Sequence, residues 1–158
     1  MSEHDEQVAL FEWAEYMANL KWPELRFMFA IPNGGWRAKT TAKWLKDEGL
    51  KPGVLDIFLP VPRGSFHGLF IEMKFGRNQL SADQRYYAEF LFEHDYLVMS
   101  CWGFEAAQAT IERYMALEVP EYMAKPAPGS ADFDSAYWKI GPREEMELRI
   151  EMEKLHDT

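Results

Sequence analysis

The sequence predicts an α/β domain in which a central mixed β-sheet is flanked by helices. Segments with helical spacing of apolar residues are interspersed along the chain with short, nearly continuous apolar runs. The chain has 158 residues, of which 47% are hydrophobic and 15% aromatic, enough to build one sizeable core. Its single cysteine, Cys101, excludes an internal disulfide framework and a cysteine-cluster zinc site.

The N-terminal segment, residues 3–20, predicts an amphipathic helix. Leu10, Trp13 and Met17 recur at spacings of three and four, which places them on one face. Pro23 follows the segment and cannot continue a helix, so we expect the helix to end before it.

The next segments are short and bounded by turn residues. Residues 26–31 are rich in aromatics and predict a strand, and residues 32–35 predict a turn because Asn and Gly tolerate positive φ. Residues 40–48 predict a short helix that Gly49 stops.

Two strands are expected at residues 54–59 and 68–74, joined through a turn at residues 63–65. Both runs are almost wholly apolar, and their short separation predicts a hairpin. A helix over residues 81–94 should begin with a capping box, since Ser81 is followed three residues later by Gln84.

A strand at residues 96–101 and a helix at residues 105–117 complete the expected core. Beyond it, the Pro-, Ala- and Gly-rich texture predicts a linker or extension over residues 119–142, followed by a charged helix at 143–158. This C-terminal part is consistent with reinforcing a dimer, covering a sheet edge or shielding a DNA groove, and the sequence does not choose among them.

The charge of the chain is unevenly distributed. The net charge is −9, yet residues 21–90 carry eleven bases and seven acids. A basic middle inside an acidic chain is typical of a polyanion-binding face, although uneven charge on a solvated surface gives the same pattern. The sequence shows no apolar run long enough for a membrane span and no apolar leader, so we expect a cytoplasmic protein and no membrane contact.

Three ionisable residues stand out in the two apolar strands. Glu72 and Lys74 point to one face of their strand, and hairpin pairing can bring Asp56 beside Glu72. Two carboxylates suit a hard divalent cation such as Mg²⁺, and the main-chain carbonyl of Met73 can add a third oxygen. The alternative is a buried Glu–Lys or Asp–Lys ion pair with a structural role only.

Five motifs in order carry a family resemblance that spans residues 3–118. They are PNGGWR (32–37), KPGVLD (51–56), GLFIEMK (68–74), LSADQ (80–84) and YLV (96–98). On these motifs the chain resembles the stand-alone VRR-NUC domain nucleases of phages and bacteria, within the PD-(D/E)XK superfamily. The resemblance implies a restriction-endonuclease-like core in the order α-β-β-β-α-β. The chain departs from the family pattern in having Leu55 before the metal-strand aspartate and no arginine at residues 98–100.

The resemblance also implies roles for individual residues. Asp56 and Glu72 match the metal ligands, for Mg²⁺ or Mn²⁺, and Lys74 matches the catalytic lysine. Gln84 matches a glutamine that contacts phosphate or water, with helix capping as its alternative role.

The family also has a glutamate on the first helix. Glu6 is the favoured candidate, because it heads the apolar stripe of that helix. Glu12 and Glu15 are the alternatives, and a plain solvated position remains open for each of the three.

Basic residues flank the expected site and suit phosphate contacts, which give affinity without sequence readout. The candidates are Arg37, Lys39, Lys43, Lys46, Lys51, Arg63 and Arg77. Trp36 and Trp44 are candidates for stacking on exposed bases, with core or hairpin packing as the alternative.

The sequence therefore predicts a divalent-metal-dependent DNA endonuclease. The resemblance implies a homodimer that acts on branched DNA such as Holliday junctions. One alternative is a non-catalytic nucleic-acid-binding or regulatory protein that retains the fold. Another, suggested by the charge of −9, is an acidic interaction protein such as a DNA mimic.

Overall fold

The computed structural model describes residues 2–32 and 39–120 of the chain. The chain divides into two units, Met1–Pro120 and Glu121–Thr158. The second unit, which holds most of the expected linker and the whole expected C-terminal helix, lies outside the described residues. So do Arg37 and Trp36.

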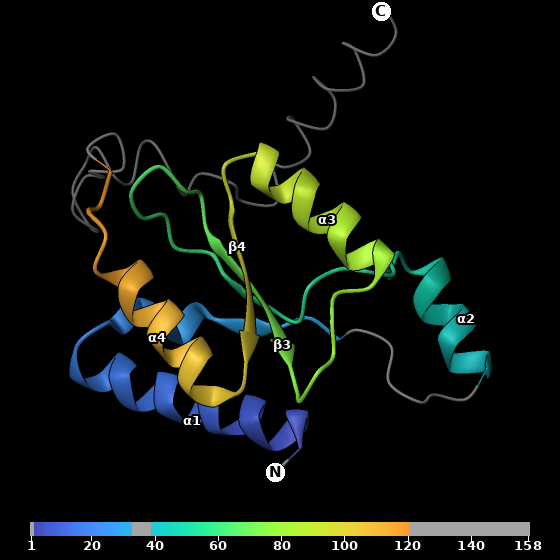
Figure 1. The fold of residues 1–158 in the computed structure, drawn as a ribbon, viewed down its shortest axis with the longest axis horizontal. Coiled ribbons are helices and arrows are strands. Elements are labelled where there is room, and N and C mark those ends of the chain that lie inside the picture. The colour runs from blue at the N-terminus through green and yellow to red at the C-terminus, as the bar shows by residue number, and fades with distance from the viewer. Residues whose placement is uncertain (1, 33–38, 121–158) are drawn as a thin grey trace, which may run out of the picture. The chain divides into compact units, whose positions relative to one another are not determined.

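The described elements follow the expected order, with one short helix in addition (Figure 1). They are α1 (Glu3–Leu20), the 3₁₀ helix η1 (Pro23–Phe27), β1 (Phe29–Ala30), α2 (Lys39–Asp47), β2 (Ile57–Leu59), β3 (Leu69–Lys74), α3 (Ala82–Glu93), β4 (Leu97–Trp102) and α4 (Phe104–Met115).

The four strands form one mixed sheet in the order β1-β2-β3-β4. β2 pairs antiparallel with β1 and with β3, where Phe58 lies opposite Phe70. β3 and β4 are parallel, with Lys74 opposite Trp102, and α3 forms the crossover between them. The expected hairpin and the mixed sheet are therefore confirmed.

Helices cover both faces of the sheet, which gives three layers (Figure 1). On one face, α1 and α4 pack against the sheet through residues such as Leu10, Ile71 and Ile111. On the other face, a smaller cluster joins Phe70 to Leu91 of α3. The charged residues of β3 lie on the same face of the sheet as Phe70, which is the face that carries the smaller cluster.

Two expected strands are shorter than the sequence suggested. Instead of a strand from residue 26, the chain forms η1, because Pro23 has the fixed φ that suits a first helical turn and Leu25 is buried. β2 begins only at Ile57. In front of it, the N–H of Met73 on β3 donates to the side chain of Asp56 rather than to a main-chain carbonyl, so the strand pairing does not extend further.

Among the described residues, no helix is both long and apolar enough to cross a membrane.

Candidate metal-binding and catalytic face

The charged residues of β3 project from one face of the sheet, as strand alternation predicts. Ile71 and Met73 are buried in the core beneath α1 and α4. Glu72 and Lys74 therefore point to the opposite face, toward α3. All six residues of β3 are buried, so a carboxylate and an ammonium group have been taken largely out of water.

Asp56 is held against β3 by a hydrogen bond to its main chain. Met73 N–H donates to Asp56 Oδ2 at 2.9 Å. The N–H and C=O groups of one strand residue point to the same side, so the Met73 carbonyl is also directed toward Asp56. The structure thus brings together the expected aspartate, Glu72 and the expected carbonyl ligand.

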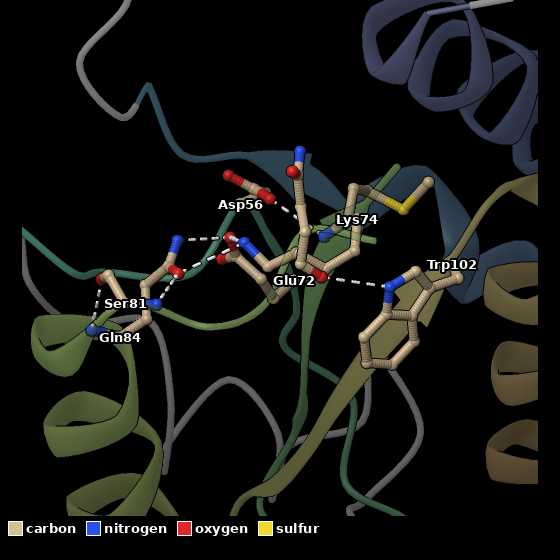
Figure 2. A network of polar contacts seen from close by, with 8 residues as sticks. Asp56, Glu72, Lys74, Ser81, Gln84 and Trp102 are labelled. Atoms are coloured by element: carbon tan, nitrogen blue, oxygen red, sulfur yellow. Dashed lines mark hydrogen bonds and ion pairs between the residues drawn. The ribbon is translucent and has the colours of Figure 1, made fainter. Parts of the chain in front are cut away.

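Glu72, Lys74 and Gln84 form a connected polar network (Figure 2). Lys74 Nζ lies 2.7 Å from Glu72 Oε1 and 3.2 Å from Gln84 Oε1. The amide nitrogen of Gln84 also donates to Glu72 Oε1. Every one of these bonds to Glu72 ends on the same carboxylate oxygen.

Gln84 reaches this network from the first turn of α3. Its backbone N–H donates to the Ser81 hydroxyl at 3.2 Å, and its side-chain oxygen accepts from Ser81 N–H at 2.9 Å, which completes the expected capping box. Gln84 therefore caps the helix and also contacts Glu72 and Lys74, while its expected contact with phosphate or water stays a prediction.

A glycine holds the chain before Asp56 against the same helix end. Gly53 has φ of +82°, and a Cβ atom there would lie 2.5 Å from the backbone carbonyl of Asp83. Only glycine permits both this conformation and this close approach. The start of α3 therefore fixes both the segment before Asp56 and the network around Glu72.

Burial dominates the electrostatics of the two carboxyl groups. Burial, helped by the nearby charge of Asp56, raises the pKa of Glu72 to about 7 against the opposing hydrogen bond and charge of Lys74. Burial also raises the pKa of Asp56, opposed by the hydrogen bond from Met73 and by the charge of Lys74. The ionised forms of both carboxyl groups are therefore disfavoured in the folded protein, and a bound cation would favour them.

The second oxygen of Glu72 tests whether the site suits a cation. Glu72 is 2% exposed, and its Oε2 atom is buried with no hydrogen-bond partner among the residues that the structure describes. A buried acceptor of this kind is rare because it costs desolvation without compensation. Oxygen ligands from Asp56, Glu72 and the Met73 carbonyl are the type that Mg²⁺ and Mn²⁺ prefer, so the donor set fits the expected ion.

The protein side chains alone do not complete a cation cage. In the part of the chain that the structure describes, no three His, Cys, Asp or Glu side chains converge on one point. An ion held by two carboxylates keeps positions for water and for a ligand oxygen, which is how Mg²⁺ is usually bound beside phosphates.

Glu6 caps a helix in this structure, and its expected catalytic role stays a prediction. Glu6 Oε2 accepts the N–H of Phe104 at 2.7 Å and so caps the first turn of α4, where Gly103 supplies no side-chain cap. Glu6 is half-buried, as its place on the apolar stripe predicts, but its carboxylate serves a helix end. Glu12 and Glu15, the alternatives, are exposed on α1.

A different part of α1 lies beside Asp56. Glu3, His4 and Gln7 line a hollow together with Asp56 and the segment after β1. Glu3 is therefore a carboxylate of the first helix that shares a surface with Asp56, one of the expected metal ligands. The sequence pattern missed it because Glu3 precedes the apolar stripe and is exposed, which resembles an ordinary first-turn acid.

The expected phosphate-binding role of Arg63 is contradicted. Arg63 is 6% exposed, its guanidinium lies 2.9 Å from Glu24, and it also donates to the Pro62 carbonyl. It sits in the hairpin turn before β3, at the far end of that strand from Lys74. Its charge is used to join this turn to η1.

The other basic candidates have different outcomes. Lys43 on α2 and Arg77 in the loop after β3 are exposed, as phosphate contacts require. Lys39 is the first residue of α2, and its side chain lies outside the described part, as does all of Arg37. Trp44 is 69% exposed, which excludes the core packing considered for it.

Comparison with known proteins shows the fold. A solved structure described as a "VRR_NUC domain protein" matches with a TM-score of 0.64 and 24% sequence identity, covering 75% of this chain and 91% of that chain. No protein-family model matches the sequence, and neither does any curated protein. The chain is therefore an α/β protein with a VRR-NUC-like fold, as the five motifs predicted, and the likeness establishes the fold alone.

Proposed function

We propose that this protein is a divalent-metal-dependent DNA endonuclease that acts on branched DNA. The observation that carries the proposal is the convergence of Asp56, Glu72 and Lys74 on one sheet face, where one buried oxygen of Glu72 has no partner in residues 2–32 and 39–120. A VRR-NUC-like fold around that face supports it.

A structural ion pair explains less of the geometry. Lys74 accounts for one oxygen of Glu72. Within the described part of the chain, it leaves Oε2 without a partner and leaves Asp56 as a second acid beside it. A pair retained only for stability would be expected to satisfy its buried atoms. The unpartnered oxygen is explained when a cation is a natural ligand of this face.

In the proposed enzyme, Asp56, Glu72 and the Met73 carbonyl hold Mg²⁺ or Mn²⁺. The ion supplies Lewis acidity toward a phosphate oxygen and lowers the pKa of a bound water. Lys74 places its ammonium group where it can orient the attacking water or stabilise negative charge on the phosphorus in the transition state. Gln84 holds the side chains of Lys74 and Glu72 in position, since it contacts both.

The proposed reaction is hydrolysis of a phosphodiester. The water oxygen forms a bond to phosphorus while the bond from phosphorus to the 3′ oxygen breaks. The hydroxyl of the water stays on the 5′ phosphate, and its remaining proton ends on the 3′ oxygen. This direction of cleavage is the one that the family resemblance implies. The ends of the labelled products would test it directly.

A panel of labelled substrates tests the activity. Duplex, single-stranded, flap and four-way-junction DNA are incubated with Mg²⁺ and with Mn²⁺. We expect cleavage of the branched substrates, and we expect Asp56→Asn and Lys74→Ala each to abolish cleavage while DNA binding survives. Undiminished cleavage by both variants would reject this site.

The proposed substrate also favours a homodimer. Two copies related by two-fold symmetry would present two sites for paired cuts on a symmetric junction. Sedimentation analysis of the full chain, with and without a four-way junction, measures the stoichiometry. A monomer in both conditions would contradict this part of the proposal.

A non-catalytic binding protein is separated from the enzyme by its affinity for cations. The enzyme should bind Mn²⁺ in the absence of DNA, and Glu72→Gln should weaken that binding. Calorimetry on the two proteins makes the comparison. Absence of cation binding, together with failure to cleave the whole panel, would favour the binding protein.

A further inference from the structure

Trp102, the last residue of β4, lies beside the catalytic lysine. In the parallel pair, Trp102 is the register partner of Lys74, about 4.8 Å away across the strands. Its neighbour Cys101 is buried in the core on the α1 and α4 side. Strand alternation therefore places the Trp102 side chain on the same face as Glu72 and Lys74.

The indole ring of Trp102 is fixed, yet open to solvent. Trp102 is 45% exposed, and its ring N–H donates to the main-chain carbonyl of Asn78 at 3.2 Å (Figure 2). Asn78 N–H in turn donates to the Phe75 carbonyl, so the acceptor belongs to a hydrogen-bonded turn. Because the polar edge of the indole is satisfied by the protein, the ring faces are what it offers to a ligand.

The main chain also ties this tryptophan to the catalytic strand. Gly103 N–H, in the residue that follows Trp102, donates to the carbonyl of Lys74. A ring anchored both through its backbone and through its N–H loses little conformational entropy when a ligand stacks on it.

The loop around Trp102 carries further features that suit a nucleic-acid strand. Phe75 is 44% exposed directly after Lys74, and Arg77 is exposed two residues later. Aromatic rings interleaved with cationic side chains are how proteins bind single strands without base-specific contacts. No such combination is needed for packing, since packing would bury the rings.

We infer that Trp102 is a base-stacking residue that binds an unpaired base next to the cleaved phosphodiester, with Arg77 on the adjoining phosphate. The inference rests on the proposed function and specifies its substrate. Bases inside a duplex are stacked on each other and cannot lie on a protein ring, so this contact requires a nucleotide that is unpaired, as at a flap or a branch point.

Binding without metal tests the stacking contact separately from chemistry. The probes are a short labelled oligothymidylate and an abasic strand of the same length, both in EDTA. We expect Trp102→Leu to bind the oligothymidylate at least about fivefold more weakly than the wild type and to bind the abasic strand equally well. Trp102→Phe, which keeps an aromatic face but loses the bond to Asn78, should retain most of the difference between the probes.

Tyr16→Leu is the matched control, because Tyr16 is also an exposed aromatic residue, at 63%, but lies on α1 and has no expected role in binding. It should leave the preference for the oligothymidylate unchanged. Thermal unfolding first shows that both variants fold. The stacking assignment is then overturned if Trp102→Leu binds both probes as the wild type does. It is also overturned if Trp102→Phe restores none of the preference for the oligothymidylate.

Cleavage assays distinguish this inference from the proposed function. If the wild type cuts flaps and Trp102→Leu cuts them equally fast relative to a plain duplex, the nuclease stands and the stacking role fails. If the wild type cuts nothing with Mg²⁺ or Mn²⁺ while Trp102→Leu still loses its preference for the oligothymidylate, the nuclease fails and the strand-binding site stands.

Discussion

The two oxygens of Glu72 have different surroundings, and this difference is the most informative residue-scale feature of the protein. Oε1 contacts both Lys74 and Gln84, whereas Oε2 is buried and meets no partner from the described segments. An unsatisfied buried acceptor costs about 1–3 kcal/mol, more when it is charged. The ionised form of Glu72 is thus less stable than it would be if a neighbouring group donated a hydrogen bond to Oε2. This is typical of a group that binds a ligand.

Glu3 is expected to contribute to cation binding at this face, because it lines the hollow that contains Asp56. Replacing an acid just outside the direct ligands typically costs between 10-fold and 100-fold in metal affinity, roughly. Glu3→Gln should therefore weaken Mn²⁺ binding by about tenfold in calorimetry. Glu15→Gln, an exposed acid on the same helix, is the control, and equal losses in the two variants would show a general charge effect instead.

The sequence predicts this face better than it predicts the residues that surround it. The alternation of β3 and the hairpin were sufficient to bring Asp56, Glu72 and Lys74 together. The capping contact of Glu6 was not predictable, since apolar spacing identifies the buried stripe of a helix but not what that stripe meets. The partner of Glu6 is the start of α4, 98 residues away in sequence.

At the scale of elements, the first turn of α3 organises the site. It supplies Gln84 to the network and packs against Gly53, which precedes Asp56. Helix formation and site assembly are consequently coupled, because the same side chain that caps α3 contacts Glu72 and Lys74.

Two substitutions separate capping from catalysis in α3. Ser81→Ala removes the hydroxyl that caps the helix and should lower the free energy of unfolding by about 1 kcal/mol with cleavage largely retained. Gln84→Ala removes a similar amount of stability but also frees Lys74 and Glu72, so its kcat should fall by more than tenfold, roughly, at an unchanged KM. Equal activities of the two folded variants would show that Gln84 only caps the helix.

The Glu6 contact makes a stability prediction for α4. Glu6→Ala leaves the N–H of Phe104 without its acceptor, and loss of a cap costs about 1 kcal/mol. Urea unfolding should show this loss, while Mn²⁺ affinity stays near that of the wild type. A large fall in Mn²⁺ affinity with little change in stability would return Glu6 to the metal site.

The helices and the hairpin were predictable because each has a local signal. The Ser81 and Gln84 spacing marks the start of α3, and apolar periodicity marks α1. η1 and the shortened β1 and β2 were not predictable in the same way. Strand length depends on which main-chain groups find partners, and here the side chain of Asp56 takes a position that a backbone carbonyl would otherwise hold.

At the scale of the whole molecule, two cores of different size hold the site between them. The larger core beneath α1 and α4 fixes the back of β3 and β4, and the smaller one fixes α3 over the front.

The average charge of the chain hides a local pattern. The net charge of −9 argues against a nucleic-acid ligand, yet Lys43 and Arg77 are exposed in the basic middle of the chain.

The stability of the metal-free protein should depend on pH through Glu72. The pKa of this group is about 7 in the folded protein and 4.5 in a free side chain. Below pH 4.5 the group is protonated in both states, so its contribution to stability is fully present. As the pH rises toward 7, the unfolded chain has lost the proton that the folded protein keeps, so the free energy of unfolding falls.

Divalent cations should reverse this trend, because they bind the ionised carboxylates and only in the folded protein. Mg²⁺ or Mn²⁺ should therefore raise the Tm of the wild type more above pH 7 than below it. Glu72→Gln should show a flatter pH profile when metal-free, since it cannot titrate, and a smaller shift with either ion. Thermal unfolding across this pH range makes the measurement. Parallel profiles for the two proteins, with equal shifts on adding Mn²⁺, would contradict a cation site built on this buried pair of carboxyl groups.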